Sequence, residues 1–184
     1  CFNVDDFLDP RLPRQFTCGY QTEQELYRHI DAGAVHLVDF TAQDPQAEAD
    51  RFEALVREAP IDVVCQGIGT SGHLALNEPG QARFHDERWV RVVDLVEQSK
   101  RQLRDDPNFR DLGYVPDRGV SMTIPAIMSA RHIYTMVPLA LKRPILTRLL
   151  ATVPASEMLP ASILQDVDGE LYVDADSCPE TVAP

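Results

Sequence analysis

Short apolar runs alternate along the chain with longer segments in which apolar residues recur at helical spacing. A capping-box sequence at residues 22–25 and a proline at position 45 fit the first turns of two helices. Helices are expected at residues 22–30, from residue 45 to the proline at position 60, at 95–103, from residue 124, and at 141–150. Strands are expected at residues 35–40, 61–65, 89–93, 120–122, 132–137 and 171–173.

This alternation predicts the α/β class, with a three-layer α/β/α arrangement around an open, mostly parallel, Rossmann-like sheet. No repeat, low-complexity tract or long linker interrupts it, so residues 1–184 are expected to form a single domain. Ligands of open parallel sheets bind beyond the carboxyl ends of the strands. We therefore expect the chemistry in three loops, at residues 3–6, at 67–80 and just after residue 137.

The charge balance narrows the range of partners. The chain has 29 acidic and 17 basic residues and a formal net charge of −12. Such a protein repels nucleic-acid phosphates and anionic membrane surfaces, so we expect no nucleic-acid partner and no membrane association. No run approaches the roughly 18 consecutive apolar residues of a membrane helix, and the first residues lack a signal-peptide pattern. These features together predict a cytoplasmic protein.

The cysteines indicate neither a disulfide framework nor a metal site. Cys1, Cys18, Cys65 and Cys178 are irregularly spaced and include no C-x-x-C pair. We expect them to be reduced thiols. The histidines also lack the paired spacing of metal ligands, so no bound metal is expected.

The loop that follows the strand at 61–65 has the spacing G-x-G-x-x-G, with glycines at Gly67, Gly69 and Gly72. An acidic residue, Asp94, lies 22 residues beyond the last glycine, which is similar to a dinucleotide-binding fingerprint. That fingerprint requires a full helix after the third glycine, but the sequence Asn-Glu-Pro-Gly at residues 77–80 breaks the chain after barely two turns. A nicotinamide cofactor is therefore a weak alternative.

The residues after these glycines indicate acid/base chemistry instead. His73 and Glu78 lie five residues apart in one short turn. A carboxylate that orients an imidazole is typical of a group that transfers protons. The alternative is that His73 only closes the loop and Glu78 is solvated, which is the usual situation for isolated residues of these types.

Five segments resemble, in the same order, the glucosamine-6-phosphate deaminase family. Residues 67–79, G-I-G-T-S-G-H-L-A-L-N-E-P, are similar to the family signature G-(I/V)-G-x-(D/N)-G-H-(I/L)-A-F-N-(E/D)-P, and residues 3–7 resemble its N-x-D-E-Y segment. Residues 119–131, Lys142 and residues 160–165 extend the likeness over nearly the whole chain. The resemblance implies the fold of that family and its cofactor-independent conversion of glucosamine 6-phosphate into fructose 6-phosphate and ammonia.

The resemblance also implies roles for individual residues. Asp5 would be the carboxylate base that moves a proton from C2 to C1 of the opened sugar. His73 would be the acid/base that opens the ring, and Glu78 would hold its orientation. The family often has a supporting aspartate where this chain has Ser71, which can form a hydrogen bond but supplies no charge.

A sugar phosphate is the ligand that the resemblance implies, and its phosphate needs cations and loop amides. Lys142 matches the phosphate-binding lysine of the family. One of Lys100 and Arg101 falls where the family places a second phosphate-binding cation, and the sequence does not choose between them. The glycines Gly67, Gly69 and Gly72 complete the expected substrate-binding set. A homo-oligomer is left open.

Two other functions share this fold or pocket. A 6-phosphogluconolactonase would need the histidine but not the enolising Asp5, and a non-catalytic sensor would bind the sugar phosphate without turning it over. Asp5 and Glu78 together favour isomerisation. Family members also carry a further strand, phosphate loop and helix before the segment with which this chain begins, so we expect the sequence to be truncated at its N-terminal end.

Overall fold

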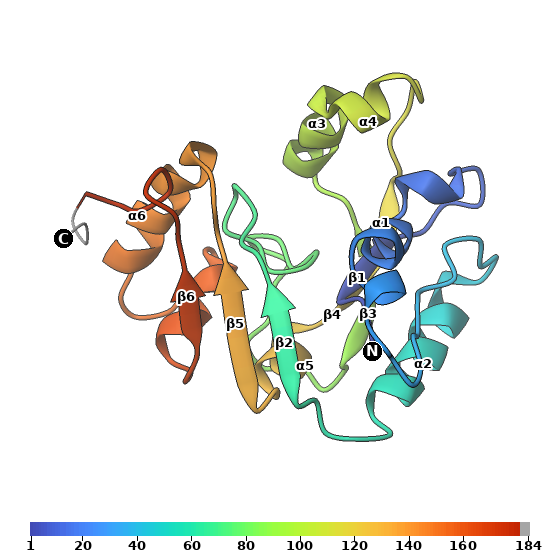
Figure 1. The fold of residues 1–184 in the computed structure, drawn as a ribbon, viewed down its shortest axis with the longest axis horizontal. Helices are drawn as coiled ribbons and strands as arrows, with labels where there is room; N and C mark the ends of the chain where they lie inside the picture. The colour runs from blue at the N-terminus through green and yellow to red at the C-terminus, as the bar shows by residue number, and fades with distance from the viewer. Residues whose placement is uncertain (181–184) are drawn as a thin grey trace. The chain divides into compact units, whose positions relative to one another are not determined.

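The computed structural model describes residues 1–180 and divides into two compact units. The first unit holds residues 1–58 and 90–122, and the second holds residues 59–89 and the chain from residue 123 onward. Figure 1 shows helices beside the strands of each unit, as the α/β class requires. The single domain expected over residues 1–184 stays a prediction.

The first unit is built on an antiparallel sheet with the strand order β1-β4-β3. The strands are β1 (Asp5–Phe7), β3 (Val90–Asp94) and β4 (Arg118–Met122). The sequence predicts a mostly parallel arrangement, and this sheet departs from it because both of its strand pairs are antiparallel. The helices α3 (Glu97–Asp105) and α4 (Pro107–Arg110) connect β3 to β4 as an excursion that leaves the two strands adjacent and antiparallel, so no crossover is needed.

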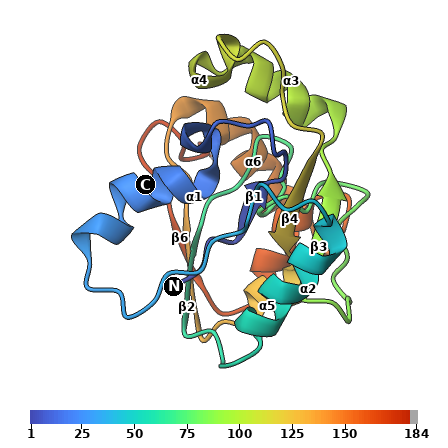
Figure 2. The same ribbon diagram turned by 90° about the vertical axis from the view of Figure 1, so that its right-hand side faces the viewer.

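Two further helices complete the first unit, together with the 3-10 turns η1 (Arg14–Phe16) and η2 (Tyr27–His29). The first, α1 (Cys18–Glu25), begins four residues before the expected capping box, because Thr17 caps it and the carboxylate of Asp6 accepts the N–H groups of Cys18 and Gly19. The second, α2 (Pro45–Val56), begins with Pro45 as expected, is capped by Asp44, and lies beside β3 (Figure 2).

The strand expected at residues 35–40 is not formed, so that prediction is wrong. His36 makes only an isolated bridge, with Phe2. The N–H of Asp39 donates to the carboxylate of Glu48 at 2.7 Å, so a side chain takes the place of a strand partner there. Val38 in this segment is therefore buried without joining a sheet.

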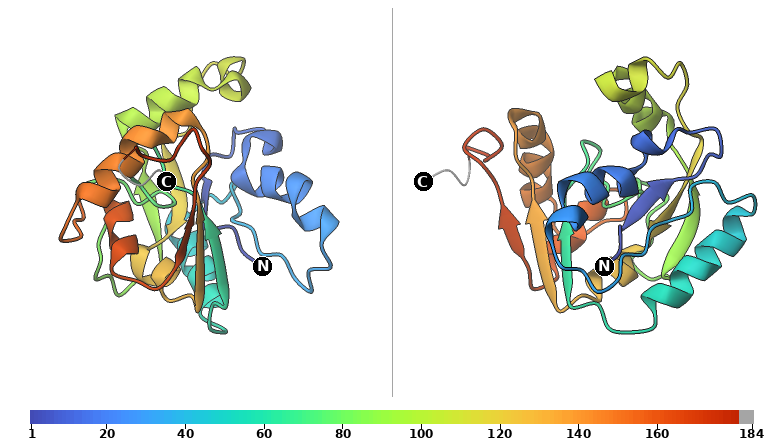
Figure 3. Two further views of the ribbon diagram at one scale, coloured as in Figure 1. Left: turned by 60° about the vertical axis from the view of Figure 1, so that its left-hand side comes forward. Right: turned by 45° about the vertical axis from the view of Figure 1, so that its right-hand side comes forward.

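The second unit contains the parallel sheet that the sequence predicts, with β5 between β2 and β6. Its strands are β2 (Val63–Gln66), β5 (His132–Met136) and β6 (Glu170–Tyr172). Its helices and turns are α5 (Ile124–Met128), η3 (Ala140–Lys142), α6 (Arg143–Ala151) and η4 (Pro160–Gln165). Figure 3 shows α6, in orange, on one side of β5 and β6.

The core of the second unit joins the glycine-rich loop to α6. Its buried members include Ile68 and Leu74 from the loop region, Val137 from the end of β5, and Leu146 and Leu149 from α6. Burying large aliphatic side chains stabilises this packing by about 1.5–3 kcal/mol for each residue. The loop after β2 and the segment after β5 are consequently held against one another.

Candidate active site

Close packing against the ring of His73 shapes the glycine-rich loop. The N–H of Gly69 donates to the carbonyl of His73 at 3.0 Å, and the N–H of Gly72 donates to the carbonyl of Gly69 at 2.9 Å. A Cβ at Gly69 would lie 2.1 Å from Nε2 and Cε1 of His73, and Gly72 has a φ of +89°. These two glycines therefore provide space and turn geometry, while their N–H groups are used within the loop.

His73 is paired with a buried carboxylate. Its Nδ1 lies 3.0 Å from Oε1 of Glu78 and 2.8 Å from Oγ of Ser71, and Ser71 Oγ lies 2.7 Å from Oε2 of Glu78. Glu78 is 3% exposed, which excludes the alternative of a solvated carboxylate. Because both contacts use Nδ1, the Nε2 edge of the imidazole is turned toward Gly69, at the carboxyl end of a parallel strand.

Lys142 lies beside the same loop. Its Nζ donates to the carbonyl of Ile68 at 2.6 Å, and Ile68 lies between Gly67 and Gly69. Partial burial lowers the pKa of Lys142, because desolvation disfavours its charged form. A cation of this kind gains most when an anion arrives and replaces the lost water.

The segment that carries Lys142 is held in a strained conformation. Leu139 has a φ of +83°, in a region that residues other than glycine rarely occupy. Its N–H donates to Oδ2 of Asp174 at 2.9 Å, and the N–H of Lys142 donates to the carbonyl of Leu139. The N–H of Ser177 donates to Oδ1 of the same aspartate, and these hydrogen bonds lower the pKa of Asp174. We call this arrangement the Asp174 clamp.

The remaining predicted site residues lie in the first unit. Asp5 is partly exposed at the start of β1, opposite Ser121 of β4, whereas its neighbour Asp6 is buried on the other face. Asp6 accepts three backbone N–H groups and supports the start of α1; burial nevertheless raises its pKa. Asp6 is thus structural, which leaves Asp5 as the carboxylate at this strand start.

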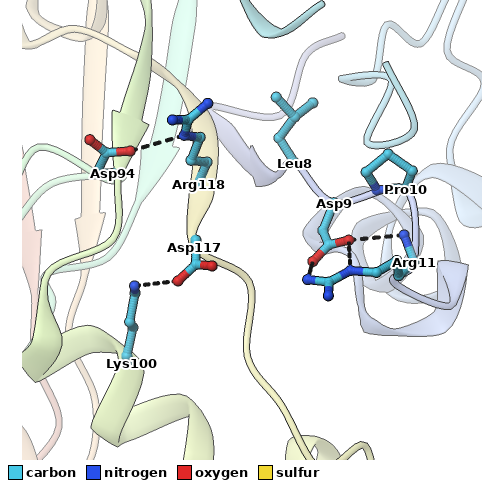
Figure 4. Close-up of a pocket in the computed structure, with 8 residues that line it drawn as sticks. All are labelled: Leu8, Asp9, Pro10, Arg11, Asp94, Lys100, Asp117 and Arg118. Atoms are coloured by element: carbon cyan, nitrogen blue, oxygen red, sulfur yellow. Dashed lines mark hydrogen bonds and ion pairs between the residues drawn. The ribbon is translucent and has the colours of Figure 1, made fainter. Parts of the chain in front are cut away.

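Lys100 and Arg101 both lie on α3 but in different surroundings. Lys100 is tied to Asp117 at 2.5 Å, whereas Arg101 is largely exposed and 3.6 Å from Glu97. Lys100 lines a pocket of about 500 Å³ in the first unit, shown in Figure 4. Its lining residues are Leu8, Asp9, Pro10, Arg11, Asp94, Lys100, Asp117 and Arg118. The six charged groups form three ion pairs, so their charges are neutralised locally.

The structure thus brings together Gly67, Gly69, Gly72, His73, Glu78 and Lys142 in the second unit, and it holds Asp5, Lys100 and Arg101 on elements of the first. No sequence motif indicates the Asp174 clamp, since Leu139 and Asp174 are 35 residues apart. Within residues 1–180, no group of three or more His, Cys, Asp or Glu side chains could hold a metal ion. No helix of that described part is long and apolar enough to cross a membrane.

These features define an α/β protein with an imidazole–carboxylate pair and a lysine at the carboxyl end of a parallel sheet. The chain belongs to the glucosamine-6-phosphate isomerase/6-phosphogluconolactonase family, whose model matches residues 17–173. A glucosamine-6-phosphate deaminase of Exiguobacterium is 32% identical over 93% of this chain and 65% of its own length. One from Staphylococcus epidermidis is 33% identical over 97% of this chain and 73% of its own length.

Two solved structures have a similar fold. A monomeric glucosamine-6-phosphate deaminase superimposes with a TM-score of 0.82 at 27% identity, over 96% of this chain and 72% of its own. The 6-phosphogluconolactonase of Thermotoga maritima superimposes with a TM-score of 0.66 at 19% identity, over 94% of this chain and 71% of its own. The second likeness concerns the fold alone. Together they confirm the expected fold type.

Gly69→Ala is expected to displace the ring of His73, because the added methyl group overlaps it. Overpacking of this kind costs about 1–3 kcal/mol of unfolding free energy. Denaturant unfolding measures the loss, and the ring resonances of His73 report the displacement. Gly67→Ala is the matched control, since a Cβ there meets its nearest neighbour, the carbonyl of Met136, at an ordinary 3.5 Å. Equal effects of the two substitutions would contradict the close approach at Gly69.

Leu139→Gly is expected to stabilise the protein by about 1 kcal/mol, because relief of the positive φ exceeds the entropic cost of glycine. Leu141→Gly, at an equally exposed position two residues on, should instead destabilise by about 1 kcal/mol. Chemical unfolding of both variants compares them. A loss of stability in Leu139→Gly equal to that in Leu141→Gly would show that position 139 carries no strain.

Proposed function

We propose that the chain converts glucosamine 6-phosphate and water into fructose 6-phosphate and ammonia, without a cofactor. The observation that carries the proposal is the His73–Glu78 pair, in which the imidazole side chain keeps 20% of its surface exposed while its carboxylate partner is buried. The relatives named glucosamine-6-phosphate deaminase support the choice of substrate. The family match over most of the chain supports the same reaction class.

In this proposal His73 opens the sugar ring. An imidazole can take and give a proton, so Nε2 can first accept the proton of the C1 hydroxyl and then deliver it to the oxygen of the sugar ring. The imidazole of His73 becomes positively charged when Nε2 accepts a proton. Glu78 stabilises this charge through its contact with Nδ1. The aldehyde that results makes the proton at C2 more acidic.

Asp5 is proposed as the base for the next step. Its carboxylate takes the C2 proton while the C1 oxygen gains a proton from the ammonium group of the substrate, which gives an enolamine. Return of the C2 proton from Asp5 to C1 then gives a protonated ketimine at C2. Water then adds to the ketimine carbon, ammonia leaves with the nitrogen, and the ketone of fructose 6-phosphate remains. Carbon, nitrogen and protons balance with one water consumed.

Lys142 is proposed to hold the phosphate, with the curved loop around Gly67 providing room for it. A second cation from α3 is also part of the proposal. Arg101 is favoured over Lys100 because its ion pair with Glu97 is long and exposed, so recruiting it breaks little. Lys100 would first have to leave Asp117.

His73→Ala is expected to lower kcat for release of ammonia from glucosamine 6-phosphate by about 10³-fold, the usual contribution of a general acid/base. A coupled assay for ammonia and fructose 6-phosphate measures this in the full-length protein. His132→Ala is the matched control, because His132 is exposed at the first residue of β5 and pairs with Val63 at the start of β2, whereas the glycine-rich loop follows the end of β2. Full activity in His73→Ala would remove the proposal.

Asp5→Asn separates deamination from the second candidate, hydrolysis of 6-phosphogluconolactone, which the description of the family also includes. Lactone hydrolysis requires His73 to activate water but no base at C2. The deaminase proposal expects loss of fructose 6-phosphate formation in Asp5→Asn and no lactone hydrolysis by either protein. Lactone hydrolysis that survives Asp5→Asn, with no ammonia released by the wild type, would favour the lactonase. Binding without either reaction would favour a sensor.

Lys142→Ala is expected to raise KM about 10- to 100-fold with a smaller effect on kcat, since one charge-assisted contact to phosphate is lost. The affinity for the substrate should depend on pH through the lowered pKa of Lys142. The lysine is charged below that pKa and loses its charge as pH rises through it, so affinity should begin to fall below pH 10.5. Lys142→Arg stays charged and should keep its affinity over the same range. The same dependence of KM on pH in the wild type and in Lys142→Arg would contradict this role.

The remaining expectations about partners and location stay proposals. A small sugar phosphate is the proposed ligand, and a homo-oligomer is left open. Cytoplasmic location fits a phosphorylated substrate, because such compounds do not cross membranes unaided.

A further inference from the structure

Three side chains form a closed triangle on the buried side of the His73 ring. Ser71 Oγ lies 2.8 Å from Nδ1 of His73 and 2.7 Å from Oε2 of Glu78, and Nδ1 lies 3.0 Å from Oε1 of Glu78. Ser71 and Glu78 are 8% and 3% exposed. Because water is largely excluded, the protons within the triangle must satisfy these contacts.

For an ionised Glu78, counting protons over these three contacts leaves one consistent arrangement. The hydroxyl of Ser71 has a single proton, and the carboxylate of Glu78 can only accept. If Ser71 donated to Nδ1, both oxygens of Glu78 would face lone pairs at 2.7 and 3.0 Å. If Ser71 donates to Oε2, its lone pair accepts from Nδ1–H, and Nδ1–H also faces Oε1. Every close contact then has a proton between its two atoms.

We propose that Ser71 is a positioning residue that fixes His73 in the Nδ1–H tautomer, so that Nε2 carries the lone pair with which the imidazole accepts a proton from the sugar phosphate. This inference deepens the proposed function and rests on it for the identity of the ligand. The hydroxyl also ties down Oε2, which keeps Oε1 of Glu78 directed at the ring. It does so without placing a second negative charge beside Glu78.

The same geometry excludes Ser71 as a nucleophile. In acyl-transfer triads the nucleophile and the carboxylate contact opposite nitrogens of the histidine. Here Ser71 and Glu78 both contact Nδ1, and the serine hydroxyl is buried with its proton already donated. Ser71 therefore acts through His73 and does not attack a substrate itself.

The tautomer can be measured directly on the full-length protein labelled with ¹⁵N-histidine. Long-range ¹H–¹⁵N correlation should show the Nδ1–H pattern for His73 in the wild type without any ligand. Ser71→Ala should show a mixture of the two tautomers, and Ser71→Thr, which keeps the hydroxyl, should restore the wild-type pattern. Ser129→Ala is the matched control, because it deletes a hydroxyl of the same unit that bonds only within the end of α5.

Kinetics supply the second measurement. Ser71→Ala should lower kcat for glucosamine 6-phosphate about tenfold, the effect of one lost hydrogen bond, with KM within about twofold. Ser71→Thr should recover most of kcat. A purely structural role would lower the amount of folded protein and leave kcat per folded molecule unchanged.

The outcomes for the inference and for the proposed function are separable. An Nε2–H pattern in the wild type, or an unchanged Nδ1–H pattern in Ser71→Ala, overturns the inference whatever the activity. A tautomer that depends on Ser71, in a protein that releases no ammonia from glucosamine 6-phosphate, supports the positioning role and removes the proposed reaction. If Ser71→Ala fails to fold, the wild-type pattern and Ser71→Thr still decide the tautomer.

Discussion

The buried carboxylate of Glu78 is the constraint on which the rest of the site depends. A carboxylate that is 3% exposed requires donors, and the loop supplies His73 and Ser71 as two of them. These two contacts fix the orientation of the imidazole, with Nδ1 directed at Glu78 and Ser71. The ring then passes so close to Gly69 that no side chain fits there. Gly69 is therefore a consequence of where the histidine lies.

The lysine side of the site follows from the same packing. The loop after β2 and the segment after β5 share one hydrophobic core, which brings Lys142 to the carbonyl of Ile68. The segment reaches that place through a positive φ at Leu139, and the Asp174 clamp offsets the strain. Strain of this kind is typical of functional sites, because the surrounding structure holds a conformation that the segment alone would avoid.

Sequence reasoning succeeded where the determining contacts are local. The pairing of His73 with Glu78 spans five residues, and the parallel sheet of the second unit follows from three clear apolar runs. It failed where distant groups decide. The antiparallel pairing of β3 with β4 depends on how α3 and α4 fill the connection between them. Residues 35–40 form no strand, and the side chain of Glu48 accepts the backbone N–H of Asp39 there.

Two features of the site could not be predicted from the sequence. Ser71 was visible only as a departure from the family pattern, since a sequence does not show that its hydroxyl bridges two side chains. The Asp174 clamp joins residues far apart in the chain, with no motif at either position. The roles of Asp5 and Arg101 stay proposals, because they depend on a bound substrate.

The most direct test of the account is a crystal structure of the full-length protein with an open-chain 2-amino-2-deoxyhexitol 6-phosphate, which lacks the carbonyl and cannot isomerise. The account predicts the phosphate at the ammonium of Lys142 and Nε2 of His73 within hydrogen-bond distance of the C1 hydroxyl, with Nδ1 still on Glu78. A ligand bound elsewhere, or one that contacts His73 only through a ring turned away from Glu78, would contradict it.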